Sequence, residues 1–485
     1  MPCFSKPGPN ALSHSAFNHQ SNTMTNSSRT LKRDLKNRHI QLIALGGAIG
    51  TGLFLGTAST IQQAGPSVIL SYAIGGVIAF IIMRQLGEMM AQEPIAGSFS
   101  NLAYKYWGNF AGLFSGWNYW LLYVLVSMAE LTAVGKYVNF WFPGVQEWQT
   151  VLFFFLLINV INLSNVRLFG EMEFWFALIK VVAIISMICL GGYILASGHG
   201  GEQSSVANLW QHGGFFPNGF SGLAMSLAIV MFSFGGLELV GIAAAEADDP
   251  QKTIPKAVNQ VLYRILIFYI GALVVLICLY PWNQLSNQAD GSNWAAFMQA
   301  SPFVLIFKNL GIDAAAHILN FVVLTAALSV YNSSVYCNSR MLYGLALQKN
   351  APSAFGKVSA NGVPVIAILF SSGATLLCVV LNYIVPESAL GILMALVVSS
   401  LVLNWAIISL THLKFRQAMV KAGTHIIFKA FWYPMANYLC LAFIVYIFWN
   451  IYMLGMWKSV VAVPLWIAIV WIGYRIREKA RQGKQ

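Results

Sequence analysis

The sequence predicts an all-α membrane protein with twelve transmembrane helices. Of its 485 residues, 58% are apolar and only 9% are charged, whereas soluble domains average about 25% charged residues. The apolar residues gather in segments close to the ~20 residues that a helix needs to cross ~30 Å of hydrocarbon. A membrane β-barrel would instead show alternating strands of roughly ten residues. Both observations therefore favour membrane-spanning helices.

The apolar segments occur in order along most of the chain and are separated by polar or basic connections. Their approximate bounds are 40–61, 66–90, 113–141, 149–165, 171–197, 219–245, 260–281, 315–346, 363–385, 389–411, 431–453 and 458–475. The sequence before them, residues 1–30, is polar and has no apolar core of a signal peptide, so we expect a disordered cytoplasmic tail. Residues 31–480 are expected to form one transmembrane domain and 476–485 a basic cytoplasmic tail.

The basic residues predict the orientation of the chain. The net charge is +12, but Lys and Arg recur in short clusters between apolar segments rather than on one surface module, which argues against nucleic-acid binding. The long connections 198–218 and 282–301 contain no Lys or Arg. With an even number of spans, the positive-inside rule then places both termini in the cytoplasm. We expect the protein to lie in the inner membrane. The 6 cysteines form no CxxC pair, so we expect no metal and no cofactor.

The first apolar segment contains a run of glycines that a continuous helix would not favour. Four of the seven residues from Gly46 to Gly52 are glycine, and each costs ~1 kcal/mol relative to Ala inside a helix. A break would free backbone N–H groups at the start of a half-helix, where they and the helix dipole bind a carboxylate. The candidate donors are Ala48, Ile49, Gly50, Thr51 and Gly52. Close helix packing by small residues is the alternative.

The sixth segment repeats this pattern, with Gly235 and Gly236 beside Glu238. Interrupted helices at corresponding positions of two halves indicate a transporter binding site at the membrane midplane. The two segments correspond if 40–197 and 219–411 are inverted repeats and the last two helices, 431–475, are appended. The carbonyl groups expected to bind an ammonium belong to Phe232, Ser233, Phe234 and Gly235. A zwitterionic α-amino acid fits both breaks, with its carboxylate at the first and its ammonium group at the second.

Several motifs resemble one transporter family. They are Gly46–Gly52, Glu93–Phe99, Phe232–Glu238, Ala245–Pro250, Ile254–Ala257 and Tyr331–Ser334. They resemble the amino acid transporter family of the amino acid–polyamine–organocation superfamily, over about residues 30 to 480. Gly116–Trp120 and Phe169–Phe176 look like the bacterial general aromatic amino acid permeases. The resemblance implies the leucine-transporter fold, five plus five helices in an inverted repeat with two more, and proton-coupled uptake of Phe, Tyr and Trp.

Among the ionisable residues inside the apolar segments, Lys180, Glu130 and Glu238 are singled out as candidates, because an ionisable group costs ~2.5–3.5 kcal/mol at a helix centre. The resemblance implies that Lys180 supplies the positive charge that a cation provides in sodium-coupled relatives, gaining and losing a proton during transport. The alternative is a snorkelling side chain or a fixed ion pair. Glu130 and Glu238 are candidates either for relaying protons or for tying helices together.

The selectivity of the pocket would come from its side chains. Phe234 and Tyr123 are the leading candidates, because a substrate ring stacked on an aromatic side chain gains ~0.5–1.5 kcal/mol beyond burial. Tyr119, Asn332 and Ser333 are further candidates, although most aromatic residues of such a chain face lipid. At the inner mouth, a gate of exposed ion pairs between Arg38 and the acidic residues Glu246, Asp248 and Asp249 is plausible, since such pairs are worth only ~0–1 kcal/mol.

The leading hypothesis is a proton-coupled importer of aromatic amino acids, whose partners are the substrate, protons and the lipid bilayer. A permease of the same family for Pro, His or γ-aminobutyrate, or an exchanger, is the alternative. An intramembrane enzyme would need a Ser–His, paired Asp or HExxH arrangement within the spans, and the sequence has none there. A channel would give uptake without saturation.

Overall fold

The computed structural model describes residues 49–93, 99–164, 166–238, 249–287 and 301–482, and throughout these residues the regular structure is helical. The long helices are α4 (Val68–Gln92), α6 (Asn109–Asn139), α7 (Glu147–Ser164), α8 (Val166–Ser197), α16 (Asp313–Leu347), α19 (Pro386–Lys421), α20 (Met435–Met453) and α21 (Trp457–Gln482). Shorter helices within the spans are α2 (Thr51–Phe54), α3 (Gly56–Ala64), α9 (Gly219–Ser233), α11 (Pro250–Arg264), α12 (Ala272–Leu279), α17 (Val365–Thr375) and α18 (Leu377–Ile384). The predicted all-α class is confirmed.

The connections also contain helical turns. They are η1 (Gly65–Ser67), α5 (Phe99–Trp107), η2 (Gly201–Gln203), η3 (Val206–Leu209), α13 (Trp282–Asn287), α15 (Pro302–Asn309) and η5 (Ser353–Gly356). The last helix, α21, continues to Gln482, so most of the segment expected to be a basic tail is helical. The tail expected at 1–30 lies outside the described residues.

Ten helical runs in the described part of the chain are long and apolar enough to cross a membrane. They correspond to every predicted segment except the first and the sixth. Among the described residues, the sixth segment contains the 15-residue helix α9, and the first contains the short helices α2 and α3. The protein is thus a multi-pass membrane protein.

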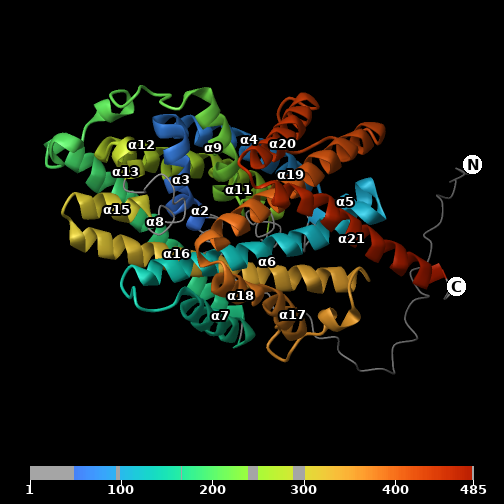
Figure 1. Ribbon diagram of the computed structural model, residues 1–485. Coiled ribbons are helices and arrows are strands. Elements are labelled where there is room, and N and C mark those ends of the chain that lie inside the picture. The colour runs from blue at the N-terminus through green and yellow to red at the C-terminus, as the bar shows by residue number, and fades with distance from the viewer. Residues whose placement is uncertain (1–48, 94–98, 165, 239–248, 288–300, 483–485) are drawn as a thin grey trace, which may run out of the picture.

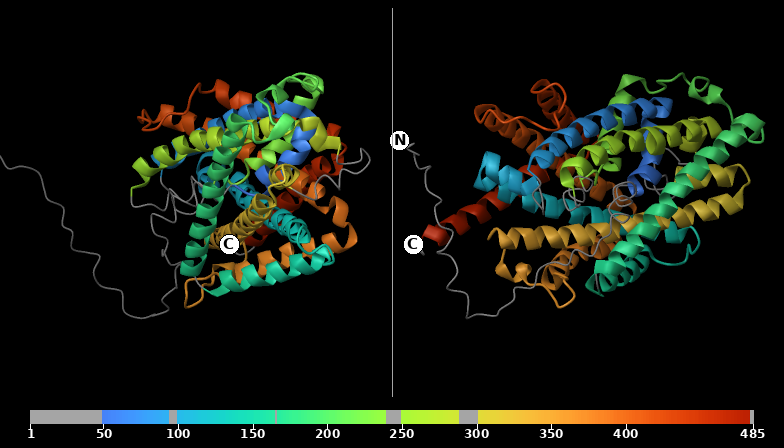
Figure 2. Two further views of the ribbon diagram at one scale, coloured as in Figure 1. Left: turned by 90° about the vertical axis from the view of Figure 1, so that its left-hand side faces the viewer. Right: turned by 180° about the vertical axis from the view of Figure 1, so that it is seen from behind.

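The centre of the helical bundle is formed by α6 and α16, which lie side by side (Figure 1). In the apolar window of α6, 89% of the residues are buried inside the protein, against 11% in α21. The helix α21 lies at the periphery, as the views from the side and from behind also show (Figure 2). Candidate site residues on α6 and α16 are therefore shielded from lipid by other helices.

The seventh span is not a regular α-helix throughout. Between α11 and α12 the chain forms a π-helix, η4 (Ile265–Gly271). Such wider turns are rare and often occur at functional sites. The fully buried Tyr269 lies in this turn, and its hydroxyl donates a 2.9 Å hydrogen bond to the carbonyl of Ser233, the last residue of α9. The π-helix thus supports the end of an interrupted helix.

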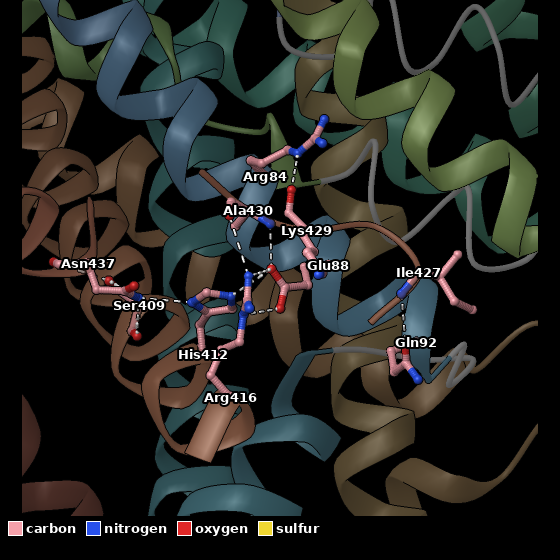
Figure 3. Close-up of polar contacts among 10 residues, drawn as sticks. All are labelled: Arg84, Glu88, Gln92, Ser409, His412, Arg416, Ile427, Lys429, Ala430 and Asn437. Carbon is pink, nitrogen blue, oxygen red and sulfur yellow. Dashed lines mark hydrogen bonds and ion pairs between the residues drawn. The ribbon is translucent and has the colours of Figure 1, made fainter. Parts of the chain in front are cut away.

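One face of α4 holds the α19–α20 connection (residues 422–434) against the bundle. Arg84, Glu88 and Gln92 are spaced four residues apart, so they share a face of the helix. Arg84 donates to the Lys429 carbonyl at 3.0 Å, and the side-chain oxygen of Gln92 accepts from the Ile427 amide at 3.2 Å. Figure 3 shows these contacts converging on the connection from one side.

The central contact of this face is a buried carboxylate. Glu88 is fully buried and accepts from Arg416 Nη2 at 2.9 Å and from the Ala430 amide at 2.5 Å. His412 Nε2 lies 3.2 Å from the same oxygen, and Asn437 contacts the other ring nitrogen at 3.1 Å (Figure 3). A buried charge needs such partners because its desolvation is costly. Glu88 therefore joins α4 to α19 and to the α19–α20 connection.

Replacement of Glu88 by Gln should lower the apparent melting temperature of the purified protein markedly. The Arg416 guanidinium would lose its counter-charge in a buried place, and breaking a buried pair by removal of one partner costs ~3–5 kcal/mol. The matched control is Glu93→Gln at the end of the same helix, where the partner Lys105 is 53% exposed; an exposed pair is worth ~0–1 kcal/mol. Equal shifts for both variants, measured by thermal unfolding in detergent, would contradict this account.

Candidate functional site

The first glycine-rich segment is not helical at Ile49 and Gly50. The backbone of Gly50 is extended, with φ −135° and ψ −153°, and α2 begins at Thr51. The first N–H groups of a helix have no partner within it, so α2 presents backbone donors inside the protein. Ala48, one of the predicted donors, lies outside the described residues.

The sixth segment is interrupted as predicted. The helix α9 ends at Ser233, and residues 234–237 form a turn in which Gly236 has φ +87°. A non-glycine residue rarely adopts this left-handed conformation, which explains the choice of glycine there. The turn also satisfies part of its own backbone, because the Phe234 amide donates to the Met231 carbonyl and the Gly235 amide to the Phe232 carbonyl.

The start of α2 and the end of α9 touch each other. A Cβ atom built on Gly52 would lie 2.6 Å from Ser233 Cα and 2.9 Å from the Ser233 backbone nitrogen. No real Cβ approaches backbone atoms so closely, so only glycine at position 52 permits this contact. The start of α2 and the end of α9 are thereby brought together in the interior, with opposite ends of two helix dipoles facing a common region.

Glu130 reaches the start of α2 from the central helix α6. Its carboxylate accepts the Thr51 amide at 3.2 and 3.3 Å and also accepts the Thr51 hydroxyl. The carboxylate is 2% exposed and lies against Gly50, where a Cβ would meet Glu130 Oε1 at 2.7 Å. An acidic group thus occupies the positive end of a half-helix, the position where a carboxylate is most favourable.

Lys180 reaches the other side of the same backbone stretch from α8. Its Nζ donates to the Ile49 carbonyl at 3.2 Å and to Ser329 Oγ of α16 at 2.9 Å, and the side chain is fully buried. Ser329 in turn donates to Glu173 Oε1 at 2.5 Å. Lys180 is therefore buried and does not snorkel to the surface, and it belongs to a hydrogen-bonded chain.

A small cavity lies between the two interruptions. Gly50, Glu130, Phe232, Tyr123 and Ser333 are among its lining residues, and its volume is about 30 Å³. A water needs roughly 10–15 Å³ by this measure, whereas pockets for small molecules occupy ~300–1,000 Å³. The cavity in this conformation holds water-sized groups only, and a larger ligand requires its walls to move.

Three of the proposed pocket residues lie behind this cavity rather than on its wall. Phe234 points away from it, into a cluster with Tyr72 and Tyr269 at ring distances of 6.0 and 5.3 Å. Asn332 is hydrogen-bonded to Asn162 at 2.8 Å and to Glu173 at 3.4 Å.

Tyr119 is the third of these residues. It donates its hydroxyl to that of Tyr123 at 3.1 Å, and their rings lie 4.8 Å apart. Tyr119 therefore supports the wall residue Tyr123 from behind. In place of Phe234, the aromatic side chain of this segment that lines the cavity is Phe232, in the last turn of α9.

Glu238 lies just after the turn of the sixth segment and is fully buried. Its Oε1 accepts the indole N–H of Trp405 on α19 at 2.5 Å. Of the two functions considered for this residue, the contact favours tying helices together, because it joins the interrupted segment to α19.

Most of the predicted inner gate lies outside the described residues, namely Arg38, Glu246 and Asp248. Asp249 is described: it caps the start of α11, and its carboxylate pairs with Lys252 at 2.9 Å. The hydrogen bond from the Lys252 side chain holds the pKa of Asp249 below its ordinary value. Among the described residues, no group of three or more His, Cys, Asp or Glu side chains could hold a metal ion.

The sequence motifs and the buried backbone breaks agree with a comparison to known proteins. The family described as "Amino acid permease" matches residues 39–482 of this chain. The protein belongs to the amino acid permease family. The family resemblance carried by the glycine and acidic motifs is thereby confirmed.

The permease is similar over nearly its whole length to named relatives. The aromatic amino acid transport proteins AroP of Shigella flexneri and of Escherichia coli (strain K12) are each 62% identical over 454 residues, which cover 93% of this chain and 97% of each relative. An uncharacterized amino acid permease, YtnA of Bacillus subtilis (strain 168), is 45% identical over 427 residues, which cover 87% and 90%. All three are named as transporters or permeases rather than enzymes.

Glu173 and Ser329 are buried polar residues of the permease that sequence reasoning did not select. Glu173 lies about two helical turns before Lys180 on α8, a spacing that puts both on one face of the helix. That spacing is a signal available in the sequence. Ser329 offers no such signal, because it is one of many serines in apolar segments. Only the packing of α16 against α8 places it between Lys180 and Glu173.

Replacing Gly52 with Ala should destabilise the permease by ~1–3 kcal/mol, the usual cost of overpacking a close contact. The added Cβ would press on the backbone of Ser233, which has little freedom to yield. Gly56→Ala is the matched control, because there the nearest atom, at 3.2 Å, is the flexible end of Met394. The measurement is thermal unfolding of both purified variants. A Gly52→Ala protein as stable as Gly56→Ala would show that the two interruptions are not in tight contact.

Proposed function

We propose that the permease imports aromatic amino acids together with protons across the bacterial inner membrane. The observation that carries this proposal is the contact between the two interrupted helices, with the start of α2 and the end of α9 on one cavity. Such interruptions bind the charged groups of substrates in other secondary transporters. The choice of Phe, Tyr and Trp as substrates is supported by the names of the relatives that are 62% identical.

The carboxylate of the substrate binds, in this proposal, at the backbone donors that begin α2, from Ala48 to Gly52. In the present conformation Glu130 accepts the hydrogen bonds of Thr51. A second carboxylate next to it would repel it, so either Glu130 takes up a proton or it moves away when substrate arrives. This competition links substrate binding to protonation at Glu130.

The ammonium group binds at the carbonyl groups that α9 leaves at its end, between Phe232 and Gly235. The Ser233 carbonyl already accepts one hydrogen bond from Tyr269, but a carbonyl oxygen has two lone pairs and can accept another. The substrate ring would then lie against Tyr123 and Phe232, with Ser333 as a polar neighbour. The cavity must widen for a ring to enter, as expected for a transporter that alternates between conformations.

The proposed orientation has both termini in the cytoplasm. It rests on the distribution of Lys and Arg, which are absent from residues 198–218 and 282–301. The proposed five-plus-five repeat is supported by the correspondence between the first and sixth segments, the two that are interrupted. The gate formed by Arg38, Glu246, Asp248 and Asp249 remains part of the proposal at the cytoplasmic mouth.

A Lys180→Ala permease should lose gradient-driven accumulation of Phe in proteoliposomes with an imposed pH gradient. Without the amine, no group at the Ile49 carbonyl changes charge when the gradient delivers a proton. Lys136→Ala is the matched control, since Lys136 is also a buried lysine, 3% exposed, but pairs with Glu147 away from the cavity. Unchanged concentrative uptake by Lys180→Ala would reject the coupling role of this lysine.

Uptake of labelled Phe should be inhibited by unlabelled Tyr and Trp, and not by Pro, Lys or γ-aminobutyrate. A wall formed by Tyr123 and Phe232 favours planar rings by ~0.5–1.5 kcal/mol per contact. The measurement is initial uptake with each competitor in excess. Inhibition by Pro, His or γ-aminobutyrate as strong as that by Tyr would favour the alternative substrates, and uptake that needs internal amino acid but no gradient would indicate an exchanger.

A further inference from the structure

A continuous hydrogen-bonded chain leads from Lys180 to a second buried carboxylate. Lys180 Nζ donates to Ser329 Oγ at 2.9 Å, and Ser329 Oγ donates to Glu173 Oε1 at 2.5 Å. All three residues are fully buried. The three groups come from two helices, α8 and α16, so their alignment depends on how these helices pack.

Ser329 differs in its chemistry from the Ile49 carbonyl, which also accepts a hydrogen bond from Lys180. A hydroxyl can accept one proton while it donates its own. The Ile49 carbonyl only accepts a hydrogen bond and cannot pass a proton on. On the far side, the second oxygen of Glu173 lies 3.4 Å from Asn332 Nδ2, a neutral donor that orients the carboxylate without neutralising it.

We propose that Lys180 passes its proton through Ser329 to Glu173, which is the proton-accepting group on the release side of the transport cycle. In this step the Lys180 ammonium gives one proton to Ser329 Oγ, and Ser329 releases its hydroxyl proton to Glu173 Oε1. A charged lysine and a carboxylate become a neutral amine and a carboxylic acid, so protons and charge balance. The inference rests on the proposed proton-coupled function and adds the route that the proton takes.

The position of Glu173 along α8 gives the route a direction. Glu173 precedes Lys180 by about two turns, or roughly 10 Å at ~1.5 Å per residue. It therefore lies closer to the N-terminal end of α8, which begins at Val166. In the orientation proposed above this is the cytoplasmic end. The step moves the proton towards the compartment into which the substrate is released.

Other charged groups also act on Lys180, namely Glu130 on α6 and Arg264 on α11. Glu130 accepts both the amide and the hydroxyl of Thr51 in this conformation. Glu173 is instead joined to Lys180 through a hydroxyl that can transfer a proton. This difference assigns the carboxylates separate functions, with Glu130 at the backbone of the cavity and Glu173 on the release route.

The test compares Glu173→Gln, Ser329→Ala and Ser329→Thr with the wild type in proteoliposomes. Gln keeps the size of Glu and can accept the Ser329 hydrogen bond, but it takes no proton at neutral pH. Thr keeps the hydroxyl that Ala removes. Each protein is assayed for accumulation of labelled Phe under a pH gradient and for exchange of labelled against unlabelled Phe at equal pH, which needs no proton release.

We expect Glu173→Gln and Ser329→Ala to keep exchange and lose accumulation, so that internal Phe only reaches the external concentration, while Ser329→Thr regains accumulation. Glu173→Gln that accumulates like the wild type would overturn the relay. So would an equal loss of exchange and accumulation in Glu173→Gln, with Ser329→Thr no better than Ser329→Ala, because a merely structural function predicts that pattern. A wild type that does not concentrate Phe under the gradient would instead reject the proposed function, and the relay with it.

Discussion

An unpaired backbone group inside a membrane protein is costly, because no bulk water is present to bind it. The two interrupted segments create such groups, and the surrounding helices satisfy them with side chains. The Thr51 amide donates a hydrogen bond to Glu130. The Ile49 carbonyl accepts one from Lys180, and the Ser233 carbonyl accepts one from Tyr269. Each of these side chains comes from a different helix. The packing of the bundle is therefore tied to the backbone of two short stretches.

The need of buried backbone groups for hydrogen-bond partners also explains why the cavity is small. The donors at α2 and the acceptors at the end of α9 are partly used by groups of the protein itself, and the cavity between them has a volume of about 30 Å³. A zwitterion offers an anion and a cation that can replace such contacts. In the proposed mechanism, binding is an exchange of partners, so that the site opens for a substrate at a small net cost in free energy.

The residue pattern predicted the interruptions and the buried charges because these depend on composition along the chain. Gly235 and Gly236 mark the turn, and Lys180 is anomalous in an apolar segment. The direction of side chains could not be predicted in the same way. Whether Phe232 or Phe234 faces the cavity depends on where α9 ends, and a shift of two residues around a helix end reverses the answer.

Contacts between distant segments could not be predicted from the sequence pattern either. The contacts of Glu88 with Arg416 and of Ser329 with Glu173 are examples. Among these contacts, the two at Gly50 bear most directly on transport. Lys180 binds the carbonyl before this glycine and Glu130 the amide after it. Lys180 and Glu130 thus contact the backbone on either side of a single extended residue, Gly50. Any displacement of Gly50 by a substrate carboxylate lengthens both hydrogen bonds at once. In the proposed mechanism, binding of substrate at this one backbone position changes the environment of both charges, which is what coupling of substrate movement to proton movement requires.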